Sequence, residues 1–132
     1  MADAGYSGTP QLKKLGIVPG KTWDVDGRPP GWAFETAPDD EARVDAGPVD
    51  VVVAFVREAA EIVPAYERLE ERIRPSGAIW IAWPRKAAGH VSDVDENAIR
   101  DAALARGLVD VKVAAIDTDW SGLKLVWRKE HR

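Results

Sequence analysis

Two basic residues follow an apolar segment in the middle of the chain. Arg85 and Lys86 come directly after the run 78–83, and Trp83-Pro84 precedes them. Guanidinium and ammonium groups at the end of a buried strand are suited to binding phosphate, carboxylate or a nucleotide tail. The alternative interpretation is that these charges form ordinary solvated surface. With side chains from the N-terminal segment included, the residues predicted to bind a small anionic ligand are Tyr6, Lys13, Lys14, Trp83, Arg85 and Lys86.

Other segments resemble known ligand-binding motifs, but the spacing of their residues does not match those motifs. Residues 16–22 resemble a phosphate-binding loop, but only three residues separate the glycines, and the motif needs four. Residues 24–27 and 93–97 lack the ligand positions of a calcium-binding loop. The chain has no cysteine, two histidines and no Gly-x-Ser-x-Gly segment. The sequence therefore predicts neither a metal site nor a serine nucleophile of the hydrolase type.

The composition limits the classes of function. The 132 residues carry 18 basic and 22 acidic side chains, a net charge of −4, without a long basic stripe. We therefore expect no general binding to nucleic acid. No apolar run approaches the ~20 residues of a membrane span, and residues 1–8 do not resemble a secretory signal. The absence of cysteine fits a cytoplasmic protein.

The centre of the chain predicts a parallel β-α-β unit. The run 50–56 is almost continuously apolar, which is typical of a strand covered on both faces. A helix is expected over 58–74, with one apolar stripe formed by Ile62, Tyr66, Leu69 and Ile73. Pro64 should kink this helix or restart it. A second buried strand follows at 78–83.

Weaker patterns on either side predict the remaining elements. A short helix from Pro10 to Leu15 should end at Gly16. We expect a first strand at 22–26, a helical turn at 32–37 and a short edge strand at 43–45. A third helix should be capped by Ser92 or Asp93 and end at Arg106 and Gly107. The alternating segments 109–113 and 122–128 predict an antiparallel hairpin, because the connection is too short for a crossover.

Together these elements predict one α/β domain over 1–132, opened by an N-terminal segment with a short helix at 1–20. The sheet should be open, Rossmann-like and mostly parallel, and should end in an antiparallel hairpin. Ligands of such sheets bind outside the carboxyl ends of the strands. That rim would carry residues 26–31, 56–58 and 83–86. Of the six tryptophans, we expect Trp23, Trp80 and Trp127 in the core, and Trp32, Trp83 and Trp120 at a cleft or subunit contact.

This order of elements resembles a shortened class I S-adenosylmethionine-dependent methyltransferase fold, and residues 74–80 resemble its turn into the fifth strand. More closely, the whole chain resembles a bacterial, mainly actinobacterial family of unknown function. The segments that carry this resemblance are 5–10, 13–17, 83–86, 108–113 and 120–126.

The methyltransferase resemblance implies a place for S-adenosylmethionine after the first strand. The residues that it would place at the cofactor are Asp26, Gly27, Gly31 and Asp45, the last on the ribose hydroxyls. The chain departs from the family's pattern here, because the Gly-x-Gly spacing is missing and Pro29-Pro30 removes two amide donors. We therefore expect no bound cofactor and a non-catalytic domain with a binding or regulatory role, exerted through self-association. The alternatives are a methyltransferase with an atypical cofactor loop and a small-anion or nucleotide binder.

Overall fold

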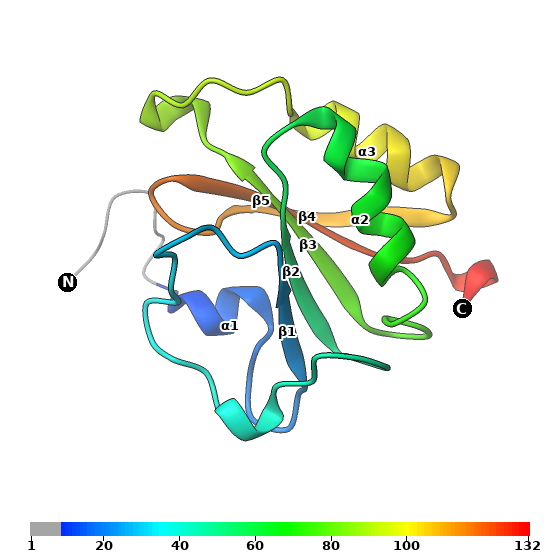
Figure 1. Ribbon diagram of the computed structural model, residues 1–132. Coiled ribbons are helices and arrows are strands. Elements are labelled where there is room, and N and C mark those ends of the chain that lie inside the picture. The colour runs from blue at the N-terminus through cyan, green and yellow to red at the C-terminus, as the bar shows by residue number, and fades with distance from the viewer. Residues whose placement is uncertain (1–8) are drawn as a thin grey trace.

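The computed structural model describes residues 9–132, which form a five-stranded sheet in the order β1-β2-β3-β5-β4 (Figure 1). The strands are β1 (Trp23–Asp26), β2 (Val51–Phe55), β3 (Ala78–Pro84), β4 (Leu108–Ala115) and β5 (Trp120–Trp127). β1, β2 and β3 pair in parallel, and β5 pairs antiparallel with both β3 and β4. The predicted α/β sheet with a C-terminal antiparallel hairpin is thus confirmed. Within residues 9–132, β5 is the only strand that runs against the others.

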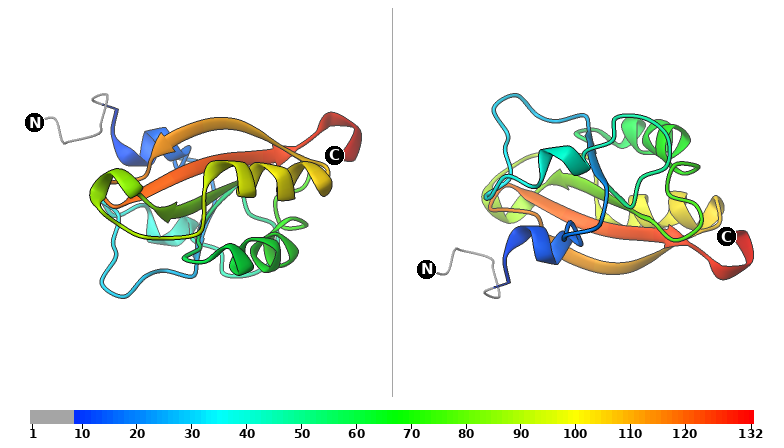
Figure 2. Two further views of the ribbon diagram at one scale, coloured as in Figure 1. Left: turned by 90° about the horizontal axis from the view of Figure 1, so that it is seen from above. Right: turned by 90° about the horizontal axis from the view of Figure 1, so that it is seen from below.

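Three α-helices cover the sheet: α1 (Gln11–Leu15), α2 (Ile62–Leu69) and α3 (Glu96–Ala105). Figure 2 shows α1 on the opposite side of the strands from α2 and α3. The alternating side chains of β2 and β3 divide the core accordingly, with Val52 and Ile79 packing toward α2 and α3, and Val53 and Trp80 toward α1. None of the helices within residues 9–132 is long and apolar enough to cross a membrane.

The β2-α2-β3 unit follows its sequence pattern closely. All five residues of β2 are buried, and so are the four residues of the predicted helical stripe. The α-helix itself is shorter than expected, because a 3₁₀ turn (Ala59–Glu61) precedes it and irregular turns follow Leu69. Pro64 therefore lies in the first helical turn, where its missing N–H has no partner to lose. The helix begins two residues before the proline, so Pro64 neither kinks nor interrupts it.

Three local predictions in the flanking segments are wrong. Residues 32–37 form no helix, and their aromatic side chains pack on the α1 side of the sheet instead. Residues 43–45 do not form a strand, since Arg43 makes a single parallel bridge with Trp23. The cap of α3 is Asp95, whose Oδ1 accepts from the Ala98 N–H at 2.8 Å. Asp93 instead accepts from the Ala59 N–H. Contacts between segments distant in the sequence thus replace the local structure expected at 32–37 and at Asp93, whereas the cap of α3 moves to a neighbouring aspartate.

The C-terminal hairpin differs from its pattern on one strand. Leu123, Leu125 and Trp127 of β5 are buried, as their alternation predicts. On β4, however, Val111 and Val113 are 54% and 51% exposed. A register shift between Asp110 and Lys112 leaves Val111 as an extra residue in the outer strand. Such a bulge interrupts the alternation of faces, and an edge strand has no neighbour to cover it.

Candidate functional site

The carboxyl ends of β1 and β2 lie side by side and border a hollow. Its volume is about 320 Å³, and it lies where open α/β sheets bind their ligands. The residues that line it are Asp26, Gly27, Phe55, Arg57, Ala60, Glu61, Pro64 and Arg68. Two predicted cofactor residues, Asp26 and Gly27, are therefore brought together, and two arginines that the sequence analysis did not nominate lie beside them.

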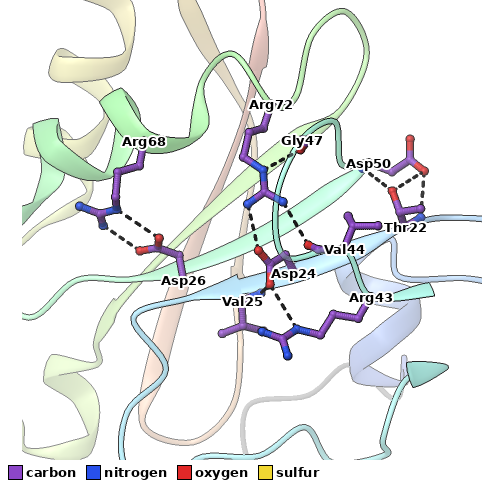
Figure 3. Close-up of polar contacts among 10 residues, drawn as sticks. All are labelled: Thr22, Asp24, Val25, Asp26, Arg43, Val44, Gly47, Asp50, Arg68 and Arg72. Carbon is purple, nitrogen blue, oxygen red and sulfur yellow. Dashed lines mark hydrogen bonds and ion pairs between the residues drawn. The ribbon is translucent and has the colours of Figure 1, made fainter. Parts of the chain in front are cut away.

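Both oxygens of the Asp26 carboxylate are bound by Arg68 of α2. The Nε of Arg68 donates to Oδ2 at 3.1 Å and its Nη2 donates to Oδ1 at 2.7 Å (Figure 3). The hydrogen bond to Asp26 raises the pKa of the guanidinium, which partial burial alone would lower. This fork-to-fork geometry is the strong form of an arginine–carboxylate pair. Asp26 therefore faces a cation of its own chain.

The backbone after β1 packs against β2. Gly27 has a φ of 68°, and a Cβ built at this position would lie 2.9 Å from the carbonyl oxygen of Phe55. Only glycine fits this approach without strain. The Nη2 of Arg57 donates to the carbonyl oxygen of Gly27 at 3.2 Å. The backbone at Gly27 is thus packed closely against strand β2 of the same chain.

The other two predicted cofactor residues lie elsewhere. Gly31 is exposed, lies within a turn in which the Trp32 N–H donates to the Pro29 carbonyl, and does not line the hollow. Asp45 is exposed and lines a separate hollow together with residues 40, 43, 44 and 46. The structure therefore assembles half of the predicted cofactor set, Asp26 and Gly27, without the residue expected at the ribose.

Two of the four basic residues predicted to bind an anion, Arg85 and Lys14, donate to backbone carbonyls. The Nη1 of Arg85 donates to the Thr118 carbonyl at 3.3 Å, and the Nζ of Lys14 donates to the Ala115 carbonyl at 3.1 Å. Burial lowers the pKa of Lys14; Glu35 opposes this shift and Lys112 adds to it. Both cations thus hold the connection between β4 and β5.

The remaining members of the predicted anion set do not converge. Lys13 is exposed on α1, and Lys86 is exposed at the start of a 3₁₀ turn after β3. Trp83 is 7% exposed and packs in the core beside α2 and α3, so it does not form an aromatic wall at the rim. Tyr6 lies outside the described residues.

Arg57 is the cation that sequence reasoning missed. It lines the hollow beside Gly27 and also a neighbouring one formed with residues 58, 60 and 91–93. Within residues 9–132, its guanidinium forms no ion pair and donates to the Gly27 carbonyl. Its position directly after the buried run that forms β2 was the available signal, since the segment 56–58 was expected at the rim.

Aromatic rings close the α1 side of this rim. Trp32 and Trp120 both pack edge-to-face on Phe55, with ring centroids 4.8 and 4.9 Å apart. The Nε1 of Trp32 donates to Oδ2 of Asp117 at 2.8 Å, which fixes the ring over the strand. No group of acidic or histidine side chains within residues 9–132 could hold a metal ion. The rim therefore offers two arginines, Arg57 and Arg68, beside an apolar wall.

The sequence profile of a family described as proteins of unknown function (DUF3052) matches residues 37–129. The chain belongs to this family. No curated protein matches the DUF3052 chain at a significant level. Its fold is similar to that of a protein of the NADB-Rossmann superfamily from Streptococcus agalactiae, with a TM-score of 0.51 and 10% sequence identity. That match covers 94% of this chain and 70% of the other.

A second solved structure with a similar fold is a proposed methyltransferase from Thermoplasma acidophilum, with a TM-score of 0.44 and 8% identity. That match covers 81% of this chain and 57% of the other. At these identities, the likeness concerns the fold alone. The fold class predicted from the sequence, an open Rossmann-like α/β sheet, is in agreement with the structure from Streptococcus agalactiae.

Proposed function

We propose that this protein is a non-catalytic, methyltransferase-like domain that acts by binding rather than by transferring a methyl group. The observation that carries the proposal is that the residues at the carboxyl end of β1 are already in contact with other parts of the chain. Asp26 is bound through both oxygens by Arg68, and the Gly27 backbone rests against Phe55. A cofactor at this place would have to displace an ion pair and a backbone contact at the same time. Pro29-Pro30 further reduces the amide donors available after the strand.

The test is a calorimetric titration of S-adenosylmethionine into the full chain. We expect no binding to the wild type and none to Arg68→Ala, because that variant frees Asp26 but leaves Gly27 against the strand. Tight binding to the wild type that Gly27→Val abolishes would refute the proposal. The result would then favour the alternative, a methyltransferase with an atypical cofactor loop.

Arg57 favours a second candidate, the binding of a small anion or nucleotide at the same rim. Arg57 lines two adjoining hollows, and within residues 9–132 its guanidinium donates to the Gly27 carbonyl at 3.2 Å without an ion pair. A phosphate could replace that weak bond with a charge-assisted one. A nucleotide panel tested by thermal shift should then raise the melting temperature, and Arg57→Ala should abolish the rise. If the double variant Arg85→Ala/Lys86→Ala abolishes it instead, the anion site is the one predicted from the sequence.

The cytoplasmic location, the actinobacterial distribution and self-association stay predictions of the sequence. Self-association can be measured independently of any ligand by analytical ultracentrifugation. A dimer would make the half-buried tryptophans, Trp32 and Trp120, the first surface to examine, because aromatic side chains are enriched at subunit contacts.

A further inference from the structure

Two lysines face each other across the C-terminal hairpin. Lys112 of β4 and Lys124 of β5 are direct cross-strand partners, and the next pair on the same face is Val109 with Val126. Leu125 and Trp127 point to the opposite face, into the core beneath α2 and α3. Lys112, Lys124, Val109 and Val126 therefore share the α1 side of the sheet, and we call them the lysine face.

The lysine face extends beyond the part of the sheet that α1 covers. Three residues of α1 are buried: Gln11, Lys14 and Leu15. Leu15 lies over β2 and β3, where it packs with Val51, Val53 and Trp80 and its carbonyl accepts from the Trp80 Nε1 at 3.0 Å. Gln11 and Lys14 donate to the carbonyls of Ile116 and Ala115 at the end of β4. In both views of Figure 2, β4 continues past α1 without a helix over it on that side. The hairpin thus presents one open face.

The two lysines are arranged unfavourably for the isolated protein. Like charges placed directly opposite on an antiparallel pair are destabilising. Burial lowers the pKa of Lys124, and the charge of Lys112 lowers it further. Within residues 9–132, neither lysine forms an ion pair with a carboxylate. Lys112 reaches the Lys14 carbonyl with its Nζ at 3.5 Å, which gathers a third cation at the same end of the face.

The shape of the lysine face favours an extended acidic chain over a small anion. Neither Lys112 nor Lys124 lines the hollows at the carboxyl ends of β1 and β2, so those hollows do not enclose the lysine face. The half-buried valine pair beside the lysines offers apolar contact over an extended area. Addition of a strand to the open edge of β4 is disfavoured by the bulge at Val111. An extended chain lying across the face can satisfy both lysines and cover the valines.

We propose that the lysine face docks an acidic polypeptide segment of another protein, one that alternates carboxylates with apolar side chains. The proposal rests on the binding role proposed above and names the partner class for it. The carboxylates of the segment pair with Lys112 and Lys124, and its apolar side chains cover Val109 and Val126. Because the protein as a whole carries a net charge of −4, attraction of an acidic partner depends on this local cluster.

The experiment uses the full chain and a short fluorescein-labelled peptide of alternating glutamate and leucine. A peptide with glutamine in place of glutamate serves as the uncharged control. Anisotropy should show binding of the glutamate peptide alone, and Lys112→Gln/Lys124→Gln should weaken it roughly tenfold, as expected for the loss of two half-exposed ion pairs. The charge-matched control Lys21→Gln/Lys129→Gln should change the affinity less than about twofold. Amide shifts in a labelled sample should map to 109–112 and 124–126.

Three results would overturn the proposal. Equal binding by the double variant and its charge-matched control would show non-specific attraction. Shifts confined to the outer edge of β4 would show strand addition instead. Competition by inorganic phosphate at equal concentration would show a small-anion site. The S-adenosylmethionine titration is a separate readout, so a failure of the non-catalytic proposal and a failure of peptide docking can be told apart. Melting temperatures of the variants should not fall, because each removes a like-charge contact or an exposed charge.

Discussion

Arg72 should be worth far more to the stability of this fold than Arg68, although both are arginines that pair with an aspartate of β1. They lie four positions apart, Arg68 in α2 and Arg72 in the turn that follows. Arg72 donates to Asp24 at 2.9 Å, to the Gly47 carbonyl at 2.7 Å and to the Val44 carbonyl at 3.0 Å (Figure 3). It therefore fixes the segment that lies beside β1 as well as the strand.

Burial separates the two arginines. The side chains of Arg72 and Asp24 are 15% and 8% exposed, whereas those of Arg68 and Asp26 are 53% and 22% exposed. Removing one partner of a buried pair costs about 3–5 kcal/mol, because a charge is left buried without compensation. Arg43 stays 3.4 Å from Asp24 and supplies part of that compensation. We therefore expect the low end, about 3 kcal/mol, for Arg72→Met.

The control is Arg68→Met, which removes an arginine of the same type from the same side of the sheet. Its pair is largely solvated, so the loss should be below about 1 kcal/mol. Urea unfolding followed by tryptophan fluorescence measures both values, provided that the two variants share the wild-type slope. A third variant, Arg72→Met/Asp24→Met, should recover much of the loss, since no charge is left buried. If Arg72→Met and Arg68→Met differ by less than about 1 kcal/mol, burial does not decide the strength of these pairs and the reasoning is refuted.

Three further predictions concern single positions. Tyr66 is buried with its hydroxyl donating to the Ile99 carbonyl, and burial strongly raises its pKa. The folded protein should therefore lose stability as the pH rises above about 10, where an unfolded tyrosine ionises, and Tyr66→Phe should remove this decline in pH-dependent melting curves. Gly27→Ala should lower the free energy of unfolding by roughly 1–3 kcal/mol, measured in urea, because of the positive φ and the contact with Phe55; an unchanged midpoint would show that the chain relaxes freely there. Lys124→Met should stabilise the protein by a few tenths of a kcal/mol to about 1 kcal/mol, because it removes a like-charge pair. In the wild type, stability should rise with pH between the lowered pKa of Lys124 in the folded state and the ordinary pKa of an unfolded lysine, and the variant should lack this rise. A destabilised variant would contradict this prediction.

The function proposed here depends on contacts at the carboxyl end of β1 that no short segment encodes. The absence of Gly-x-Gly and the presence of Pro29-Pro30 already weighed against a cofactor in the sequence. The structure adds that Asp26 is bound by Arg68 and that Gly27 rests on β2. A cofactor bound at this place would have to displace both contacts, and the cofactor titration tests this directly.

Several residues show how far the pattern reaches and where it stops. The stripe of α2 was visible because residues three and four apart share a helix face, whatever the rest of the chain does. Trp83 was misplaced, because alternation along a strand shows that neighbours point to opposite faces but not which face is enclosed. The valines of β4 were misread for a related reason. Their alternation is real in the sequence, but the bulge and the sheet edge leave Val111 and Val113 exposed.

The sequence by itself determined the β-α-β centre, the hairpin and the boundaries set by Gly16 and Gly107, because these follow from periodicity and from the backbone freedom of single residues. The tertiary structure decided which charges meet. Arg68 and Arg72 lie outside the apolar stripe of the helix predicted over 58–74, yet they pair with aspartates 42 and 48 positions away in the chain. Such pairings depend on the strand order, which places β1 beside β2 beneath α2, and a local pattern carries no information about that arrangement.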